Sequence, residues 1–235
     1  AVGRLIDLLP LSYTNAVVLV GAVVLGITAG VLGAFAVLRE RSLIGDALSH
    51  AALPGVAIAF LFTGAKDATS LGAGAAIACV AAAVLIVLIE RTGRLRPDAA
   101  IGAVLAGFFS LGIVLLTYLA NFNNANQAGL DQYLFGQAAG LLERDVNVMA
   151  ALCAASLLAV AVAFRPLKTT LFDPQFAASA GLPVRTIELA MTAMLVVAVV
   201  VGIRTVGAIL MVALLVVPTV TARQLADRLG VVLVL

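Results

Sequence analysis

Long apolar runs alternate with short polar or charged segments along most of the chain. All but the last of the long runs are close to the ~20 residues that a helix needs to cross the hydrocarbon core of a bilayer. The last run is too long for one crossing, so it predicts two spans joined by a tight turn near residues 202–207. The pattern predicts about seven spanning helices. They lie at residues 16–38, 47–63, 68–89, 99–120, 146–164 and, as a pair, 189–222.

Two further segments are too short or too polar to span. Residues 3–11 place leucines beside Arg4 and Asp7, which predicts a short helix in the membrane interface. Residues 130–142 carry Asp131 near their start and two glycines, which predicts a short re-entrant or interfacial helix. These segments therefore add short helices to the spans.

Glycines recur at near-helical spacing in the first run, at Gly21, Gly26, Gly30 and Gly33. Small residues on one side of a membrane helix let a neighbouring helix approach closely. We expect this span to pack against another helix through its glycines.

Composition sets the class of protein. Hydrophobic residues make up 63% of the chain and charged residues 11%, against about 25% charged in soluble domains. This predicts an all-α, polytopic membrane protein. The net charge of +2 comes without a basic stripe, so nucleic-acid binding is not expected. Because no repeat or linker interrupts the pattern, residues 1–235 are predicted to form a single transmembrane domain.

Basic residues indicate the orientation. Most of the fourteen lysines and arginines fall in four loops, at residues 39–41, 91–96, 165–185 and 223–228. Cytoplasmic loops carry an excess of these residues, so all four loops are predicted to be cytoplasmic. With seven spans, the N-terminus would then lie outside.

The strongest candidate site is the pair Asp46 and His50 at the start of the second span. His50 is the single histidine of the chain, and Asp46 precedes it by four residues. In a helix the two side chains lie one turn apart on the same face, where both can bind one metal ion. Pro54 in the same span removes a helical hydrogen bond near His50, so a kink or an unwound turn could present carbonyl groups there.

Two interpretations of this pair stay open. An ionisable residue inside a membrane is costly and marks a functional site by default. Alternatively, Asp46 caps the N-terminus of the helix after Gly45, and His50 lies near the lipid headgroups.

A second motif, residues 172–183, has the start and stop signals of a short helix between two spans. An aspartate can cap its first turn, a proline fits its first position, and a glycine suits the left-handed residue after its last turn. As a docking element it would press its aromatic side chains into a partner's groove, whereas a surface connector would leave them loosely packed. The residues concerned are Phe172, Asp173, Pro174, Phe176 and Gly181.

Four stretches together resemble the permease subunits of bacterial ABC importers for manganese, zinc or iron, the ABC-3 metal permease family. The resemblance is carried by the Ser-Leu-Ile-Gly-Asp-Ala-Leu-Ser-His segment and by the loop that runs from Phe-Asp-Pro to Gly-Leu-Pro. The combination of these two motifs is specific to that family. The stretches are residues 38–56, 129–137, 172–184 and 206–223.

The resemblance implies the helical fold of the metal and vitamin B12 importers, in a bacterial plasma (inner) membrane. It implies a homodimer, or a pair with a paralogous permease, driven by two cytoplasmic ATPase subunits and supplied by an extracellular metal-binding protein. ATP would be hydrolysed on the partner subunits, so the chain would not itself be an enzyme. Family members continue with further membrane segments beyond the position that matches Leu235.

The resemblance also implies roles for the two motifs. Asp46 and His50 would line the translocation path and hold the metal, and residues 172–183 would form the cytoplasmic coupling helix. The chain would bind no permanent cofactor, because the metal is its cargo.

The donor atoms narrow the choice of metal. One carboxylate and one imidazole suit Mn²⁺, Fe²⁺ or Zn²⁺ better than Mg²⁺ or Ca²⁺, and manganese is our first expectation.

The chain contains no Gly-x-x-x-x-Gly-Lys-Ser/Thr motif for ATP phosphates. The alternative is a proton-coupled metal transporter without an ATPase, which leaves the docking helix unexplained. An intramembrane metalloenzyme would need a third protein ligand and a base.

Overall fold

The computed structural model of the chain describes residues 12–39, 41, 43–64, 68–93, 95–121, 136, 143–226 and 228–233. Across these residues the secondary structure is helical and contains no strand, which confirms the all-α prediction. The interfacial helix predicted at residues 3–11 lies outside the described residues. So does the segment predicted at residues 130–142, with Asp131, apart from Gly136.

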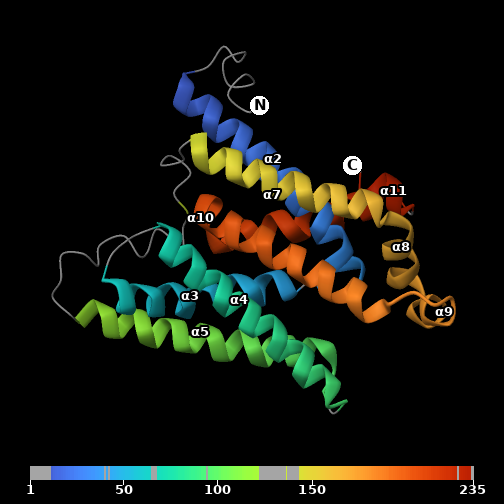
Figure 1. Cartoon of the computed structure of the whole chain (residues 1–235), viewed down its shortest axis with the longest axis horizontal. Coiled ribbons are helices and arrows are strands. Elements are labelled where there is room, and N and C mark those ends of the chain that lie inside the picture. Colours follow the sequence, from blue (N-terminus) through green and yellow to red (C-terminus); the bar gives the residue numbers. More distant parts are fainter. Residues whose placement is uncertain are drawn as a thin grey trace. The chain divides into compact units, whose positions relative to one another are not determined.

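Among the described residues, six helices are long and apolar enough to cross a membrane, and they coincide with the predicted runs (Figure 1). Two shorter helices, α8 (Phe164–Phe172) and α9 (Pro174–Ser179), connect α7 to α10, and a third, α11 (Leu229–Val232), follows α10. The long helices are α2 (Tyr13–Leu38), α3 (Ile44–Thr63), α4 (Ala68–Arg91), α5 (Pro97–Asn121), α7 (Glu143–Val162) and α10 (Val184–Leu225).

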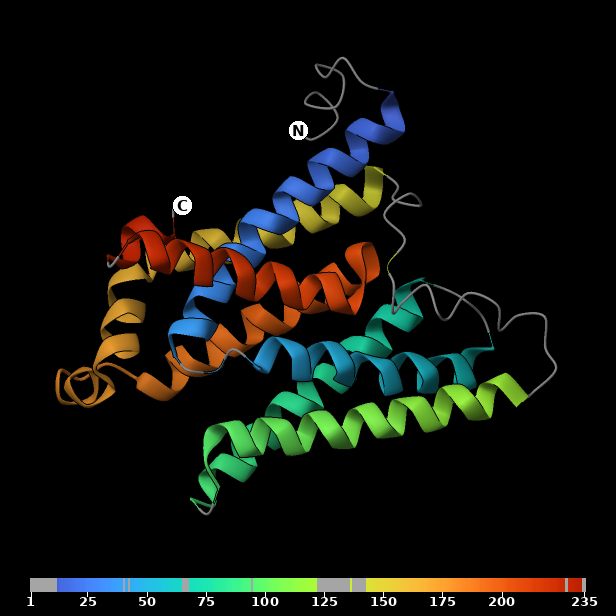
Figure 2. The same ribbon diagram turned by 180° about the vertical axis from the view of Figure 1, so that it is seen from behind.

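Helix α10 is interrupted at Gly207, whose φ of 82° and ψ of 169° are not helical. The side chain of Met211 lies against Gly202, although nine residues of straight helix would separate them by about 13 Å. The chain therefore reverses direction at Gly207, and Figures 1 and 2 show the second half of α10 running back past the first. This confirms the two spans predicted within residues 189–222.

The chain divides into two compact units. Unit 1 consists of residues 1–40, 138–198 and 214–235, and unit 2 consists of residues 41–137 and 199–213. The single domain predicted for residues 1–235 stays a prediction.

In unit 2, α3 is the inner helix and packs against both α4 and α5. In α3, 72% of the apolar stretch that would cross the membrane is buried inside the structure, compared with 28% in α4 and 22% in α5. The close packing depends on glycines, because Gly55 of α3 and Gly74 of α4 each lie against the backbone of the other. A Cβ on Gly112 of α5 would come within 2.9 Å of the Leu53 Cβ. Larger residues at these positions would push the helices apart.

Unit 2 also contains the reversal of α10. Gly136, which has a positive φ of 76°, lies directly against the backbone of Val206 and Gly207. A Cβ on Gly136 would occupy the space that this backbone fills. Gly136 therefore lies in close contact with the reversal of α10.

In unit 1, α2 packs against α7 through Ala16, Val17 and Val146. Helix α2 also contacts the second half of α10, where Gly33 lies against the backbone carbonyl of Leu215. The close approach expected for the glycines of the first span is confirmed there.

An ion pair anchors each side of the connection between α2 and α3. Arg39, after the end of α2, contacts Glu188 of unit 1 at 2.6 Å between Nη2 and Oε1. Arg41, before α3, contacts Glu90 of unit 2 at 2.9 Å between Nη2 and Oε2. Each unit therefore holds its own end of the connection.

Candidate metal site

Asp46 lies in the first turn of α3, but it does not cap the helix. The N-cap position is Leu43, and no side chain forms a capping hydrogen bond there. A carboxylate in the first turn is favoured by the helix dipole without a direct bond to the backbone. The capping interpretation of Asp46 is therefore wrong, and the carboxylate is directed to another partner.

That partner is His50. The Nε2 atom of His50 and the Oδ1 atom of Asp46 are 3.2 Å apart, one helical turn from each other. Metal–ligand distances of about 2.1 Å would place two such atoms at an angle of about 100° on one ion. This angle lies between the octahedral value of about 90° and the tetrahedral value of about 109°. The pair can therefore bind one divalent ion with little rearrangement of α3.

The His50 ring is oriented by Phe109 of α5. The two ring centroids are 4.8 Å apart and the planes meet at 71°, an edge-on contact. The Nδ1 atom of His50 is buried and has no hydrogen-bond partner among the described residues. Metal-binding histidines usually donate their second ring N–H to a protein group or water. Asp46 and Phe109 therefore each contact this ring, and its Nδ1 atom is left without a protein partner among the described residues.

Pro54 follows His50 by four residues inside α3, and α3 remains helical through it. No unwound turn forms at Pro54. Proline has no N–H to donate, so the carbonyl of His50 loses its helical hydrogen bond. The predicted loss of a backbone hydrogen bond next to His50 therefore occurs without unwinding.

The site offers few protein ligands. Among the described residues, no group of three or more histidine, cysteine, aspartate or glutamate side chains could hold a metal ion. Asp46 and His50 are 32% and 24% exposed, so water or another molecule can reach them. Two ligands leave most coordination positions free, which suits an ion that passes through more than one that is kept.

The second motif folds as a short capped helix, α9. The carboxylate of Asp173 accepts a hydrogen bond of 2.8 Å from the Phe176 N–H, and Pro174 takes the first position. After the last turn, Gly181 has a φ of 80°. The Leu182 N–H donates to the Ala177 carbonyl at 3.0 Å, the arrangement expected after a left-handed glycine. The predicted start and stop signals of this helix are thus confirmed.

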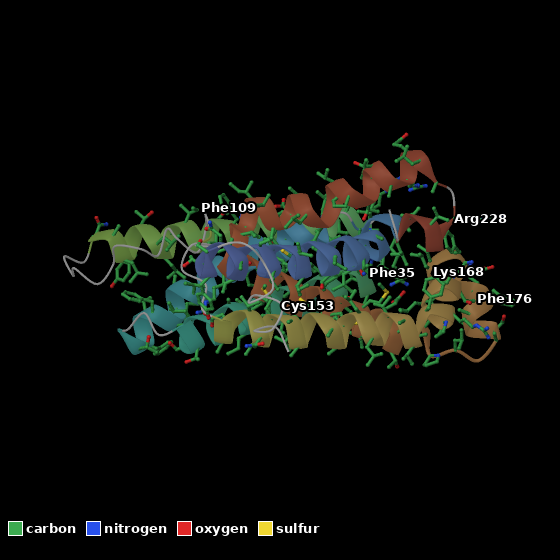
Figure 3. All side chains as sticks on the ribbon, turned by 90° about the horizontal axis from the view of Figure 1, so that it is seen from above. Phe35, Phe109, Cys153, Lys168, Phe176 and Arg228 are labelled. Atoms are coloured by element: carbon green, nitrogen blue, oxygen red, sulfur yellow. The ribbon has the colours of Figure 1, made fainter. Side chains whose placement is uncertain are left out.

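The aromatic side chains of this motif are largely exposed. Phe172 is 61% exposed at the end of α8, and Phe176 is 59% exposed on α9. Figure 3 shows Phe176 of α9 near the right-hand edge of its view. Both side chains are therefore accessible to another molecule.

Sequence reasoning missed Phe109 and Ser49. Ser49 is fully buried beside His50 and its hydroxyl has no partner among the described residues. An aromatic residue in an apolar span carries no signal of its contact with a distant histidine. Neither residue could be found from spacing alone.

Known proteins are similar to this chain over nearly its whole length. It is 46% identical over 212 residues to the manganese transport system membrane protein MntC of Bacillus subtilis, covering 90% of this chain and 49% of that protein. It is 43% identical over 219 residues to the zinc transport system membrane protein TroC of Treponema pallidum, covering 93% and 74%. The chain thus spans about half the length of that MntC and three quarters of TroC.

A solved structure has the same fold. PsaBC from Streptococcus pneumoniae in complex with Fab superposes with a TM-score of 0.79 and 32% sequence identity, covering all of this chain and 81% of that one. Six membrane-length helices and these relatives identify a multi-pass protein of the bacterial inner membrane. Residues 12–235 match the ABC 3 transport family. The chain therefore belongs to the ABC 3 transport family, as its two motifs predicted.

Proposed function

We propose that this chain is the permease of an ATP-driven importer that moves a divalent transition metal into the cytoplasm, with Asp46 and His50 on the metal path. The observation that carries the proposal is the pair of donor atoms, Oδ1 and Nε2, 3.2 Å apart on the most buried span of unit 2. A bare divalent ion cannot enter hydrocarbon, so a permease must replace part of its water with such ligands.

Manganese is the cargo that we favour, with zinc and iron as alternatives. MntC of Bacillus subtilis is named for manganese and TroC of Treponema pallidum for zinc. A carboxylate beside an imidazole is a suitable donor pair for each of these ions. The metal is therefore a substrate, released after each crossing.

The partners follow from the parts that the chain provides. It has no phosphate-binding loop, so ATP would bind to a pair of cytoplasmic ATPase subunits. The exposed Phe176 of α9 would enter a groove on one ATPase subunit, with Phe172, Asp173, Pro174 and Gly181 supporting the coupling helix. An extracellular metal-binding protein would deliver the ion, and a second copy or a paralogue would complete the path. We propose that residues 1–235 act as one permease domain.

The test is metal binding and uptake by variants of the pair. Asp46→Asn and His50→Ala should each reduce Mn²⁺ uptake into proteoliposomes about tenfold or more, because each removes a ligand. Asp98→Asn is the matched control, since Asp98 lies in the first turn of another span, α5. Binding of Mn²⁺ to the purified chain, followed by the loss of the free-ion EPR signal, should weaken in the same two variants alone. Normal uptake by a folded His50→Ala protein would refute the metal path.

A further inference from the structure

A cavity of about 480 Å³ lies in unit 1 beside α8, at the ends of two spans. The spanning part of α7 ends at Val162, one residue before the turn that begins α8. Helix α10 ends at Leu225, three residues before Arg228 enters the cavity wall. The cavity is therefore at the level where two helices leave the hydrocarbon, which is where lipid headgroups lie. The residues that line the cavity are Phe164, Lys168, Phe172, Arg228, Leu229, Gly230 and Val231.

One stripe of α8 forms a wall of this cavity. Phe164, Lys168 and Phe172 follow one another at intervals of four residues, so they lie on the same side of the helix. Leu167 and Thr170 are buried on another side. A helix that buries one face and carries phenylalanine and lysine on another is typical of a helix at the membrane surface.

Two basic side chains, Lys168 and Arg228, line the cavity. Neither Lys168 nor Arg228 forms an ion pair with any residue that the structure describes. Figure 3 labels both side chains, and they lie near each other in its view. Apolar side chains flank this pair on both helices. The occupant that fits such a lining has an anionic head and an apolar body.

We propose that this cavity binds one anionic phospholipid, with its phosphate between Lys168 and Arg228 and its acyl chains along Phe164, Phe172 and Val231. Basic side chains near a membrane surface attract anionic lipids, and two of them beside apolar residues select a lipid over a free anion. An acidic protein segment would use the two charges but would not need the phenylalanines beside them.

A lipid in this cavity would also restrict the movement of α9, because α9 follows α8 directly. Asp173 is at once the residue after α8 and the N-cap of α9, so no flexible linker separates the two helices. A lipid that holds α8 also holds α9. This consequence rests on the proposed function, in which α9 is the coupling helix, whereas lipid binding itself does not.

The chain contains no tryptophan, so a single Phe164→Trp substitution provides a fluorescent reporter inside the cavity. In bilayers, brominated phosphatidylglycerol should quench this tryptophan at much lower mole fraction than brominated phosphatidylcholine. Lys168→Gln or Arg228→Gln should each reduce the preference about fivefold, and the double variant should abolish it. Lys168→Arg should keep it, because the charge remains. The matched control is Arg165→Gln, an exposed cation of α8 outside the cavity.

Three outcomes would overturn the proposal. The first is equal quenching by both lipids in the otherwise unchanged protein, and the second is an equal loss of preference in Arg165→Gln. The third is displacement of phosphatidylglycerol by inorganic phosphate or by added ATPase subunits, which would make a free anion or a protein the occupant. Because quenching is measured without metal or ATP, the result is independent of whether Asp46 and His50 carry the metal.

Discussion

At the residue scale, the orientation of the His50 ring decides how well it can meet an ion. Nε2 faces Asp46, Nδ1 has no hydrogen-bond partner among the described residues, and the edge-on contact with Phe109 limits rotation of the ring. A ring that is free to turn would have to be ordered each time a metal binds. Phe109 therefore acts as a positioning residue for the proposed site.

We predict that Phe109→Leu weakens Mn²⁺ binding to the purified chain by up to about tenfold, since an edge-on aromatic pair contributes about 0.5–1.5 kcal/mol. The free-ion EPR signal measures this affinity directly. Phe108→Leu is the matched control, because Phe108 precedes Phe109 on α5 and has no ring contact with His50. Equal affinities for both variants would show that Phe109 does not position the ring.

The sequence predicted one part of this site and not the other. Asp46 and His50 are four residues apart in one helix, so their proximity follows from helical geometry alone. Phe109 reaches His50 because Gly112 allows α5 to lie close to Leu53 and Pro54 of α3. That contact depends on tertiary packing, which the spacing of residues along the chain does not contain.

At the element scale, α9 is fixed at both ends by its own residues. Asp173 caps its start and Gly181 ends it in a left-handed conformation, and both positions could be predicted because capping is a local property. The reversal at Gly207 was likewise predictable, since the run was too long for one span. The surface that α9 presents to a partner depends on that partner, and local signals do not report it.

We predict that Phe176→Asp weakens binding of the ATPase subunits by about 30-fold or more, because it would place an unpaired charge in an apolar groove. Co-purification and metal-stimulated ATP hydrolysis measure the effect. Gln175→Asp adds the same charge one residue earlier on the exposed surface of α9 and should bind nearly normally. The permease should still fold, since Phe176 is 59% exposed. Wild-type binding and transport by Phe176→Asp would remove α9 from the coupling role.

At the scale of the whole molecule, the described helices form two compact units, each with its own close contacts. The Asp46–His50 pair belongs to unit 2, and α9 belongs to unit 1. The run pattern predicted the spans but not this division, because it depends on contacts between residues far apart in the chain, such as Gly33 with Leu215 in unit 1 and Gly55 with Gly74 in unit 2. If Asp46 and His50 carry the metal and α9 binds an ATPase subunit, as we propose, transport requires the metal site to respond to events at α9.

The two energy sources that the sequence left open, ATP hydrolysis and a proton gradient, predict different conditions for metal uptake. If the chain is driven by ATP, proteoliposomes holding the permease with its ATPase subunits should accumulate Mn²⁺ only when ATP is on the ATPase side, and a proton ionophore should leave the rate unchanged. The catalytically inactive ATPase is the matched control, because it keeps the docking surface while it stops hydrolysis. A proton-coupled transporter would behave in the opposite way, since Asp46 and His50 would carry protons and a pH gradient alone would drive uptake. Uptake by the permease without ATPase subunits, driven by a pH gradient and abolished by the ionophore, would therefore contradict the ATP-driven mechanism while leaving the metal site intact.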